Sequence, residues 1–270
     1  NLKIAEKSGF LDSISPETFE ILEKAGIGGL DFKELSSVSF QNIIAIVYES
    51  FFLKLREPFE AILTEKYLGV PGHCARQYVP KRDKYVPGGQ MWVTESGDAG
   101  CGGNTWASTY ADVPRTLNEL GEFTTVTDGV IFHNTLASSD YGFLKHGTFD
   151  PRPNYFAVLL WNRIMGTTVY DTKEEIREGA HVYAHSRKDG KDGLVYLVIN
   201  NSRTDTTDVE LPKEAEAYIL EGQGKLRSRV MTLNGKPLVL GENDTLPELT
   251  PQTVSGKVTL TPGACAFFVL

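Results

Sequence analysis

The pattern of apolar residues changes near Thr168, and this change constrains the fold more than any other feature of the 270-residue chain. Before it, short apolar runs alternate with stretches of helical spacing. After it, runs of β-forming residues are separated by turn residues. Strand–helix alternation predicts parallel βα units, whereas closely spaced short strands predict an antiparallel β sandwich. We therefore predict an α/β domain over residues 1–167 and a β-sandwich domain over residues 168–270.

The expected elements follow from these runs. In the first domain, strands are predicted at 2–5, 38–41, 91–94 and 130–132. Helices are predicted at 15–26, 43–68, 106–120 and 155–165, with Gly121 and Gly166 as stops for the last two. In the second domain, β runs lie at 181–185, 194–199, 207–211, 217–220, 229–233, 257–260 and 264–270. Asp189-Gly190 and Asn234-Gly235 favour hairpin turns there.

The first domain contains four βα units, which is half of a barrel. An eight-unit barrel typically takes about 250 residues. A half barrel would expose two strand edges, which folded proteins avoid, so another segment or chain would have to close it. The alternative is a small open α/β layer.

Composition excludes several classes of protein. The net charge of −8 argues against a general nucleic-acid binder, and no apolar stretch is long enough for a membrane span. A basic cluster with tyrosines at 76–85 is interpreted as a solvated loop. The three cysteines lie too far apart for a zinc-finger spacing, so no metal site is expected, and one disulfide pair remains open.

Glu95 is the strongest candidate for a catalytic residue, because it directly follows the apolar run at 91–94. Catalytic side chains of βα barrels project from the carboxyl ends of strands, and a carboxylate there can approach the anomeric carbon of a sugar. The alternative is an N-cap or a surface acid. Gly102 and Gly103 follow in a glycine-rich loop that can expose backbone N–H groups to an anion; the alternative is a plain tight loop.

Polar residues also follow two other predicted strands. His133 and Asn134 end the strand at 130–132, and Tyr141 follows in the next loop. Gln41 and Asn42 have the same position after the strand at 38–41. Polar groups after an apolar strand suit the mouth of a ligand site, although His133 fits a satisfied core histidine equally well.

Three segments carry a resemblance to a known family: residues 91–103, residues 149–155 and the run that ends at Leu270. Together they resemble the heparanase and exo-β-glucuronidase family of retaining glycoside hydrolases (family 79). The resemblance implies a (β/α)8 barrel followed by a β sandwich, with this chain as the C-terminal portion that starts at strand five. It implies that Glu95 is the nucleophile, that Gly102 and Gly103 bind the substrate carboxylate, and that Tyr141 lines the same pocket.

The chain departs from the family at three functional positions. The family's acid/base is a Glu in an Asn-Glu-Pro segment, which we expect upstream of Asn1, on a missing segment or a separate chain. Gln41, Asn42 and Ile43 stand where His and Tyr residues are common. These residues imply less polar support for the nucleophile than in the family. Cys101 stands in place of one glycine of the loop.

The resemblance predicts hydrolysis of β-linked glucuronic acid with retention, by two carboxylates and without a metal or organic cofactor. The expected substrate is a glucuronide or a glucuronate-containing oligosaccharide, and the expected partner is the N-terminal half of the same enzyme. A secreted, periplasmic or lysosomal location is favoured over a cytoplasmic one. The alternatives are the same mechanism on a xyloside or iduronide, a catalytically inert carbohydrate-binding or interaction protein, and an incomplete fragment.

Overall fold

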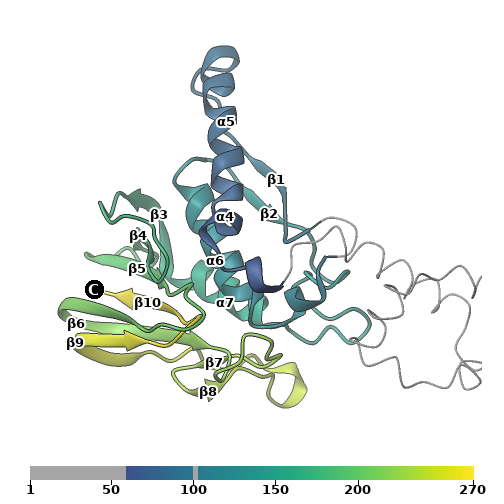
Figure 1. Cartoon of the computed structure of the whole chain (residues 1–270), viewed down its shortest axis with the longest axis vertical. Coiled ribbons are helices and arrows are strands. Elements are labelled where there is room, and N and C mark those ends of the chain that lie inside the picture. Colours follow the sequence, from purple (N-terminus) through teal and green to yellow (C-terminus); the bar gives the residue numbers. More distant parts are fainter. Residues whose placement is uncertain (1–58, 100–102) are drawn as a thin grey trace, which may run out of the picture. The chain divides into compact units, whose positions relative to one another are not determined.

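The computed structural model describes residues 59–99 and 103–270, which belong to one compact unit from Pro58 to Leu270. Figure 1 shows helices between a parallel pair of strands and a larger sheet. The helices are α4 (Glu65–Leu68), α5 (Val70–Tyr85), α6 (Asp112–Thr124) and α7 (Pro153–Ile164), with 3-10 turns η3 (Phe59–Ala61), η4 (Thr105–Ser108) and η5 (Glu242–Asp244). None of the helices described is long and apolar enough to span a bilayer. The elements predicted at 2–5, 15–26 and 38–41, and most of that at 43–68, lie outside the described residues.

The interpretation of residues 76–85 as a loop was wrong, because these residues belong to helix α5. Helix α5 contains two prolines, Pro71 and Pro80. Pro71 lies in the first turn of the helix, where the N–H that proline lacks has no partner within the helix anyway. Pro80 lies inside the helix, a position that sequence rules count as a break.

Strands β1 (Val93–Ser96) and β2 (Ile131–His133) form a parallel pair, with Val93 opposite Ile131 and Ser96 opposite His133. Both were predicted, slightly closer to the N-terminus, so Glu95 lies inside β1 rather than directly after it. The helix predicted at 106–120 starts later, as α6, and continues through its predicted stop. Gly121 is a packing residue, because a Cβ there would lie 2.5 Å from the ring of Tyr183.

The larger sheet is antiparallel, in the order β3-β4-β5-β10-β6-β7-β8, and β9 pairs with β6. Its strands are β3 (Met165–Tyr170), β4 (His181–Arg187), β5 (Leu194–Ile199), β6 (Thr207–Glu221), β7 (Thr232–Leu233), β8 (Lys236–Pro237), β9 (Gln252–Leu260) and β10 (Cys265–Val269). The runs predicted at 207–211 and 217–220 form one strand, β6, which pairs with β9 along 207–217 and with β10 along 216–220. Asn234 and Gly235, both with positive φ, form the predicted turn between β7 and β8.

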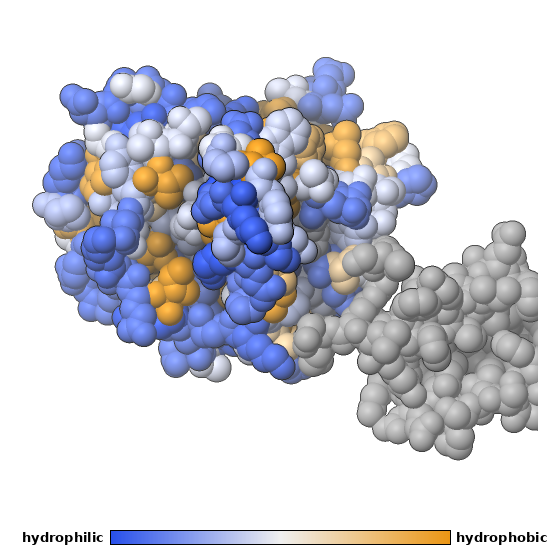
Figure 2. Space-filling view, turned by 90° about the horizontal axis from the view of Figure 1, so that it is seen from above, coloured by the Kyte–Doolittle hydropathy of each residue, from blue (hydrophilic) through white to orange (hydrophobic). Residues whose placement is uncertain are grey.

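Apolar side chains cover both faces of this sheet, because successive residues of a strand point to opposite sides. On one face Phe267 packs in a cluster with Leu117 of α6 and Leu160 of α7. On the other face Phe268 packs in a cluster with Ala217 and Leu260. The outer surface in Figure 2 is mostly hydrophilic, with separate apolar patches. The predicted domain boundary between residues 167 and 168 falls within β3 and stays a prediction.

Candidate active site

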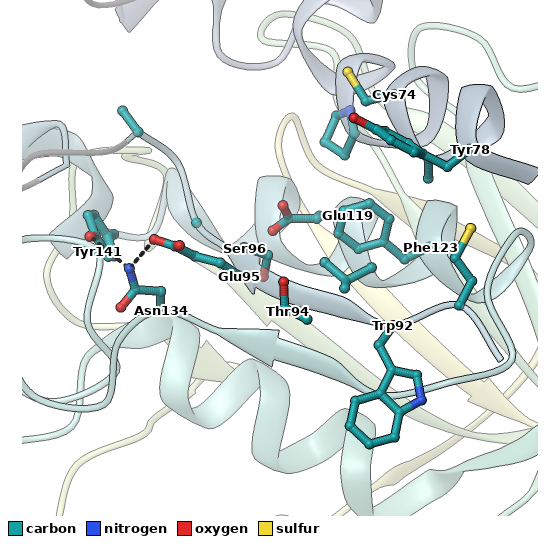
Figure 3. A pocket seen from close by; sticks show the side chains of 16 residues that line it. Cys74, Tyr78, Trp92, Thr94, Glu95, Ser96, Glu119, Phe123, Asn134 and Tyr141 are labelled. Carbon is teal, nitrogen blue, oxygen red and sulfur yellow. Dashed lines mark hydrogen bonds between the residues drawn. The ribbon is translucent and has the colours of Figure 1, made fainter. Parts of the chain in front are cut away.

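The carboxyl ends of β1 and β2 lie side by side, because the two strands are parallel and Ser96 stands opposite His133. Residues at the ends of neighbouring parallel strands therefore meet at one edge, which is where α/β folds build ligand sites. Two candidates from different parts of the sequence, Glu95 and Asn134, come together there. Figure 3 shows them with Tyr141 beside them.

Glu95 presents an exposed carboxylate that is held by one amide group. Nδ2 of Asn134 donates to Oε1 of Glu95 at 2.7 Å and lies 3.5 Å from the hydroxyl oxygen of Tyr141. A hydrogen bond to an ionised carboxylate is short and about twice as strong as a neutral one. This contact orients Glu95, and an oriented carboxylate is a possible nucleophile or base.

Tyr141 is buried, and two side chains bind its backbone carbonyl. Nε2 of His133 donates to this oxygen at 2.8 Å, and Nδ2 of Asn154 donates to it at 3.2 Å. The ring of His133 also stacks on Phe143, with 4.0 Å between ring centroids. Burial lowers the pKa of His133, which favours the neutral imidazole. His133 therefore supports the loop that carries Tyr141.

The glycine-rich loop approaches Tyr141 closely at Gly103. Gly103 has a φ of +77°, and a Cβ there would lie 2.3 Å from Cδ1 of Tyr141. Asp98, which the sequence reasoning did not single out, accepts hydrogen bonds from the backbone N and Nδ2 of Asn104, at 2.7 and 2.8 Å. Gly102, Gln41 and Asn42 lie outside the described residues, so their predicted roles stay predictions.

A cluster of buried charges on α6 lies beside the same site. Nε of Arg115 is 2.5 Å from Oδ1 of Asp112, and Nη1 of Arg115 is 2.8 Å from Oε2 of Glu119. Asn154 connects this cluster to Tyr141, because its Nδ2 also donates to Oδ2 of Asp112 at 2.8 Å. Burial raises the pKa of Glu119. The spacing of Asp112, Arg115 and Glu119, three and four residues apart, is a helical signal that sequence reasoning missed.

A cavity of about 720 Å³ connects these groups. Glu95, Asn134 and Tyr141 line one part of it, and Glu119 of α6 and Tyr78 of α5 line another (Figure 3). This volume lies within the range of small-ligand pockets, ~300–1,000 Å³. Within residues 59–99 and 103–270, no group of three or more His, Cys, Asp or Glu side chains is arranged to hold a metal ion.

Sequence comparisons relate the chain to glycoside hydrolases. It is 30% identical over 167 residues to baicalin-β-D-glucuronidase of Scutellaria baicalensis, covering 59% of this chain and 32% of that protein. It is 30% identical over 249 residues to heparanase-like protein 1 of Arabidopsis thaliana, with coverages of 77% and 46%. It is 28% identical over 211 residues to inactive heparanase-2 of Homo sapiens, with coverages of 69% and 36%. No family model matches the chain.

A solved structure shares the fold of the chain. A 4-O-α-L-rhamnosyl-β-D-glucuronidase from Fusarium oxysporum 12S matches with a TM-score of 0.55 at 14% identity, over 79% of this chain and 50% of that chain. The sequence matches confirm the predicted resemblance to the heparanase and glucuronidase family. The chain spans less than half the length of the three curated relatives named above.

Proposed function

We propose that this relative of the heparanases and glucuronidases supplies the nucleophile of a retaining glycosidase that cleaves β-linked glucuronic acid. The observation that carries the proposal is the 2.7 Å hydrogen bond from Asn134 to the exposed Glu95 carboxylate, at the carboxyl edge of a parallel strand pair. The relatives support the glycosidase class, because the one from Scutellaria baicalensis carries the name glucuronidase.

The mechanism uses Glu95 in two steps. Its carboxylate attacks the anomeric carbon and forms a glycosyl ester, while a second carboxyl group protonates the departing oxygen. That second group then removes a proton from water, which attacks the same carbon and releases Glu95. Asn134 engages Oε1, and we assign the attack to Oε2.

The second carboxyl group has to lie about 5–5.5 Å from Glu95 in a retaining enzyme. Glu119 lines the same cavity, but its Oε2 is bound by Arg115 at 2.8 Å, which disfavours a role as a proton donor. We therefore propose that an upstream segment or a separate chain supplies the acid/base. The same segment would complete a barrel in which β1 and β2 are strands seven and eight, followed by a β sandwich.

The glucuronic acid specificity is part of the proposal. The backbone N–H groups at Gly102 and Gly103, with Tyr141, would hold the uronic carboxylate, since backbone amides in a glycine-rich loop form anion sites. A xyloside or an iduronide is the alternative substrate for the same mechanism. Rates on aryl glucuronide, xyloside and iduronide, measured with the upstream portion supplied, distinguish the three.

The direct test is a 2-fluoro glucuronide with a very good leaving group, followed by peptide mass spectrometry. Such a leaving group departs without an acid, so this chain can be tested alone. We expect one adduct, on Glu95, and none in Glu95→Gln. Exposed Glu248 provides the matched control, because Glu248→Gln leaves the cavity intact and should label like the wild type. A folded sample that gives no adduct, while a known glucuronidase is labelled in parallel, contradicts the proposal.

A second candidate is a catalytically inert carbohydrate-binding or interaction protein. The similarity to inactive heparanase-2 favours it, as does the engagement of Glu119 by Arg115. Binding of a glucuronide to the chain, without turnover even when the upstream portion is supplied and without an adduct on Glu95, would support this candidate.

A further inference from the structure

Asp98 closes the glycine-rich loop with a single carboxylate oxygen. It lies three residues after Glu95, and its Oδ2 accepts hydrogen bonds from both the backbone N and Nδ2 of Asn104. These two bonds tie residue 98 to residue 104 across the loop. Hydrogen bonds to an ionised carboxylate are strong and directional, so Asp98 fixes where the loop re-enters the fold.

The environment of the other carboxylate oxygen of Asp98, Oδ1, is energetically unfavourable. Oδ1 is buried and has no hydrogen-bond partner among the described residues. Burial, and secondly the nearby charge of Asp112, raise the pKa of the Asp98 carboxyl. Burying an acceptor without a partner is destabilising, because the oxygen loses its hydrogen bonds to water. Stability alone therefore does not account for a carboxylate at this position.

Asp98 is connected to the proposed nucleophile through a chain of neighbouring residues. A Cβ on residue 103 would lie 2.9 Å from Oδ1 of Asp98 and 2.3 Å from the ring of Tyr141, so Gly103 fits between the two side chains. The hydroxyl of Tyr141 lies 3.5 Å from Nδ2 of Asn134, which donates to Glu95. A shift of Asp98 would therefore move Gly103 and Tyr141, on the side of the site where the sugar carboxylate is proposed to bind.

We infer that Asp98 is a positioning residue that fixes the relative positions of Gly103 and Tyr141. In this way it gives the site its preference for a uronic acid over a neutral sugar. This inference rests on the proposed function. For variants that lack the Asp98 carboxylate, it predicts a change in affinity for the glucuronide opposite in sign to the change expected from charge alone. Removing a negative charge near an anionic sugar should tighten binding, whereas loss of positioning should weaken it.

The experiment compares two labelling reagents, a 2-fluoro glucuronide and a 2-fluoro glucoside, each with the same activated leaving group. The affinity and the maximal rate of labelling are measured separately for the wild type, Asp98→Ala, Asp98→Asn and Asp208→Asn. Asp208 is an exposed aspartate of β6 and gives a matched control. Thermal unfolding checks that each variant is folded. If Asp98→Ala does not fold, Asn104→Ala replaces it, because this variant removes only the hydrogen bond from Nδ2 of Asn104.

We expect Asp98→Ala to lose at least ~10-fold of the preference for glucuronide, which corresponds to ~1.4 kcal/mol, mainly through weaker affinity. Asp98→Asn should retain part of it, because its amide oxygen still accepts from the Asn104 backbone. Labelling by the glucoside, and all rates of Asp208→Asn, should change little.

Four results overturn the inference. An equal loss for both sugars in a folded variant assigns Asp98 a structural role. Tighter binding of the glucuronide in Asp98→Asn shows that its charge opposes the substrate and that it does not position the site. A wild type that labels equally with both sugars retains the nucleophile but refutes uronate preference, whereas a wild type that labels with neither refutes the proposed function and this inference together.

Discussion

Gly103 has a backbone conformation that side chains rarely adopt, and it also has no room for a side chain. Its φ is +77°, and a Cβ would lie 2.3 Å from Cδ1 of Tyr141. Gly190 provides a matched control, because its φ is +74° and a Cβ there would have no other atom within 4 Å. We expect Gly190→Ala to cost about 1–2 kcal/mol from the backbone alone.

Gly103→Ala should cost at least about 1 kcal/mol more than the control, because the ring of Tyr141 has to move. It should also slow labelling of Glu95, whereas Gly190→Ala should not. Urea unfolding and the labelling rate measure the two effects. Equal destabilisation of the two variants, with unchanged labelling, would contradict a tight contact between Gly103 and Tyr141.

Single residues of the site were only partly predictable from the sequence. Glu95 and Asn134 were found because each lies at the end of an apolar run, and the structure joins them by a hydrogen bond. Asp98 and Asn154 were missed. The partner of Asp98, Asn104, lies six positions on in the same loop, whereas the partners of Asn154 lie on α6 and in the loop of Tyr141. A polar side chain inside a loop or at a helix start looks like a surface residue until those partners are known.

At the scale of elements, helix α6 carries a buried cluster of charges, and the contribution of this cluster to the stability of the fold depends on pH. Burial raises the pKa of Glu119 above its usual value of 4.5. A carboxyl whose pKa is raised in the folded state stabilises the fold below its unfolded pKa, and this contribution is lost as pH rises through the folded pKa. Glu119→Gln removes this titration.

The wild type should therefore lose stability relative to Glu119→Gln as pH rises from about 4.5. Urea unfolding of both proteins at several pH values between 4 and 7 measures the difference. Exposed Glu248 supplies the control, since the free energy of unfolding of Glu248→Gln should change with pH as that of the wild type does. Parallel curves for Glu119→Gln would show that Arg115 compensates the buried charge fully.

Elements were predictable where local preference agreed with packing. Strands β4 and β5 follow from runs of β-forming residues, which lie on a covered sheet. Helix α5 was missed because Pro71 and Pro80 look like breaks. Gly121 was taken as a stop, although it lies inside α6 so that Tyr183 can pack against the backbone. At Gly121 a tertiary contact outweighs the local signal.

At the scale of the whole described unit, a polar network joins the helices to the large sheet. Buried His181 of β4 places Nδ1 2.6 Å from Oδ1 of Asn118 on α6, and Nε2 2.9 Å from Oε1 of Glu65 on α4. Asn201, which follows β5, donates to the same Glu65 oxygen at 2.7 Å. No sequence pattern links these residues, because Glu65 and His181 are separated by more than a hundred positions.

Glu65→Ala removes the acceptor of two buried donors, on His181 and Asn201, while the sheet and helices keep their own hydrogen bonds. An unpaired buried donor costs about 1–3 kcal/mol, so we expect a loss of stability in that range with an unchanged dependence on urea concentration. Glu60→Ala, at an exposed position of η3, should have almost no effect. If instead Glu65→Ala splits the unfolding into two transitions, the network is what makes helices and sheet unfold together, and the two layers are separable folding units.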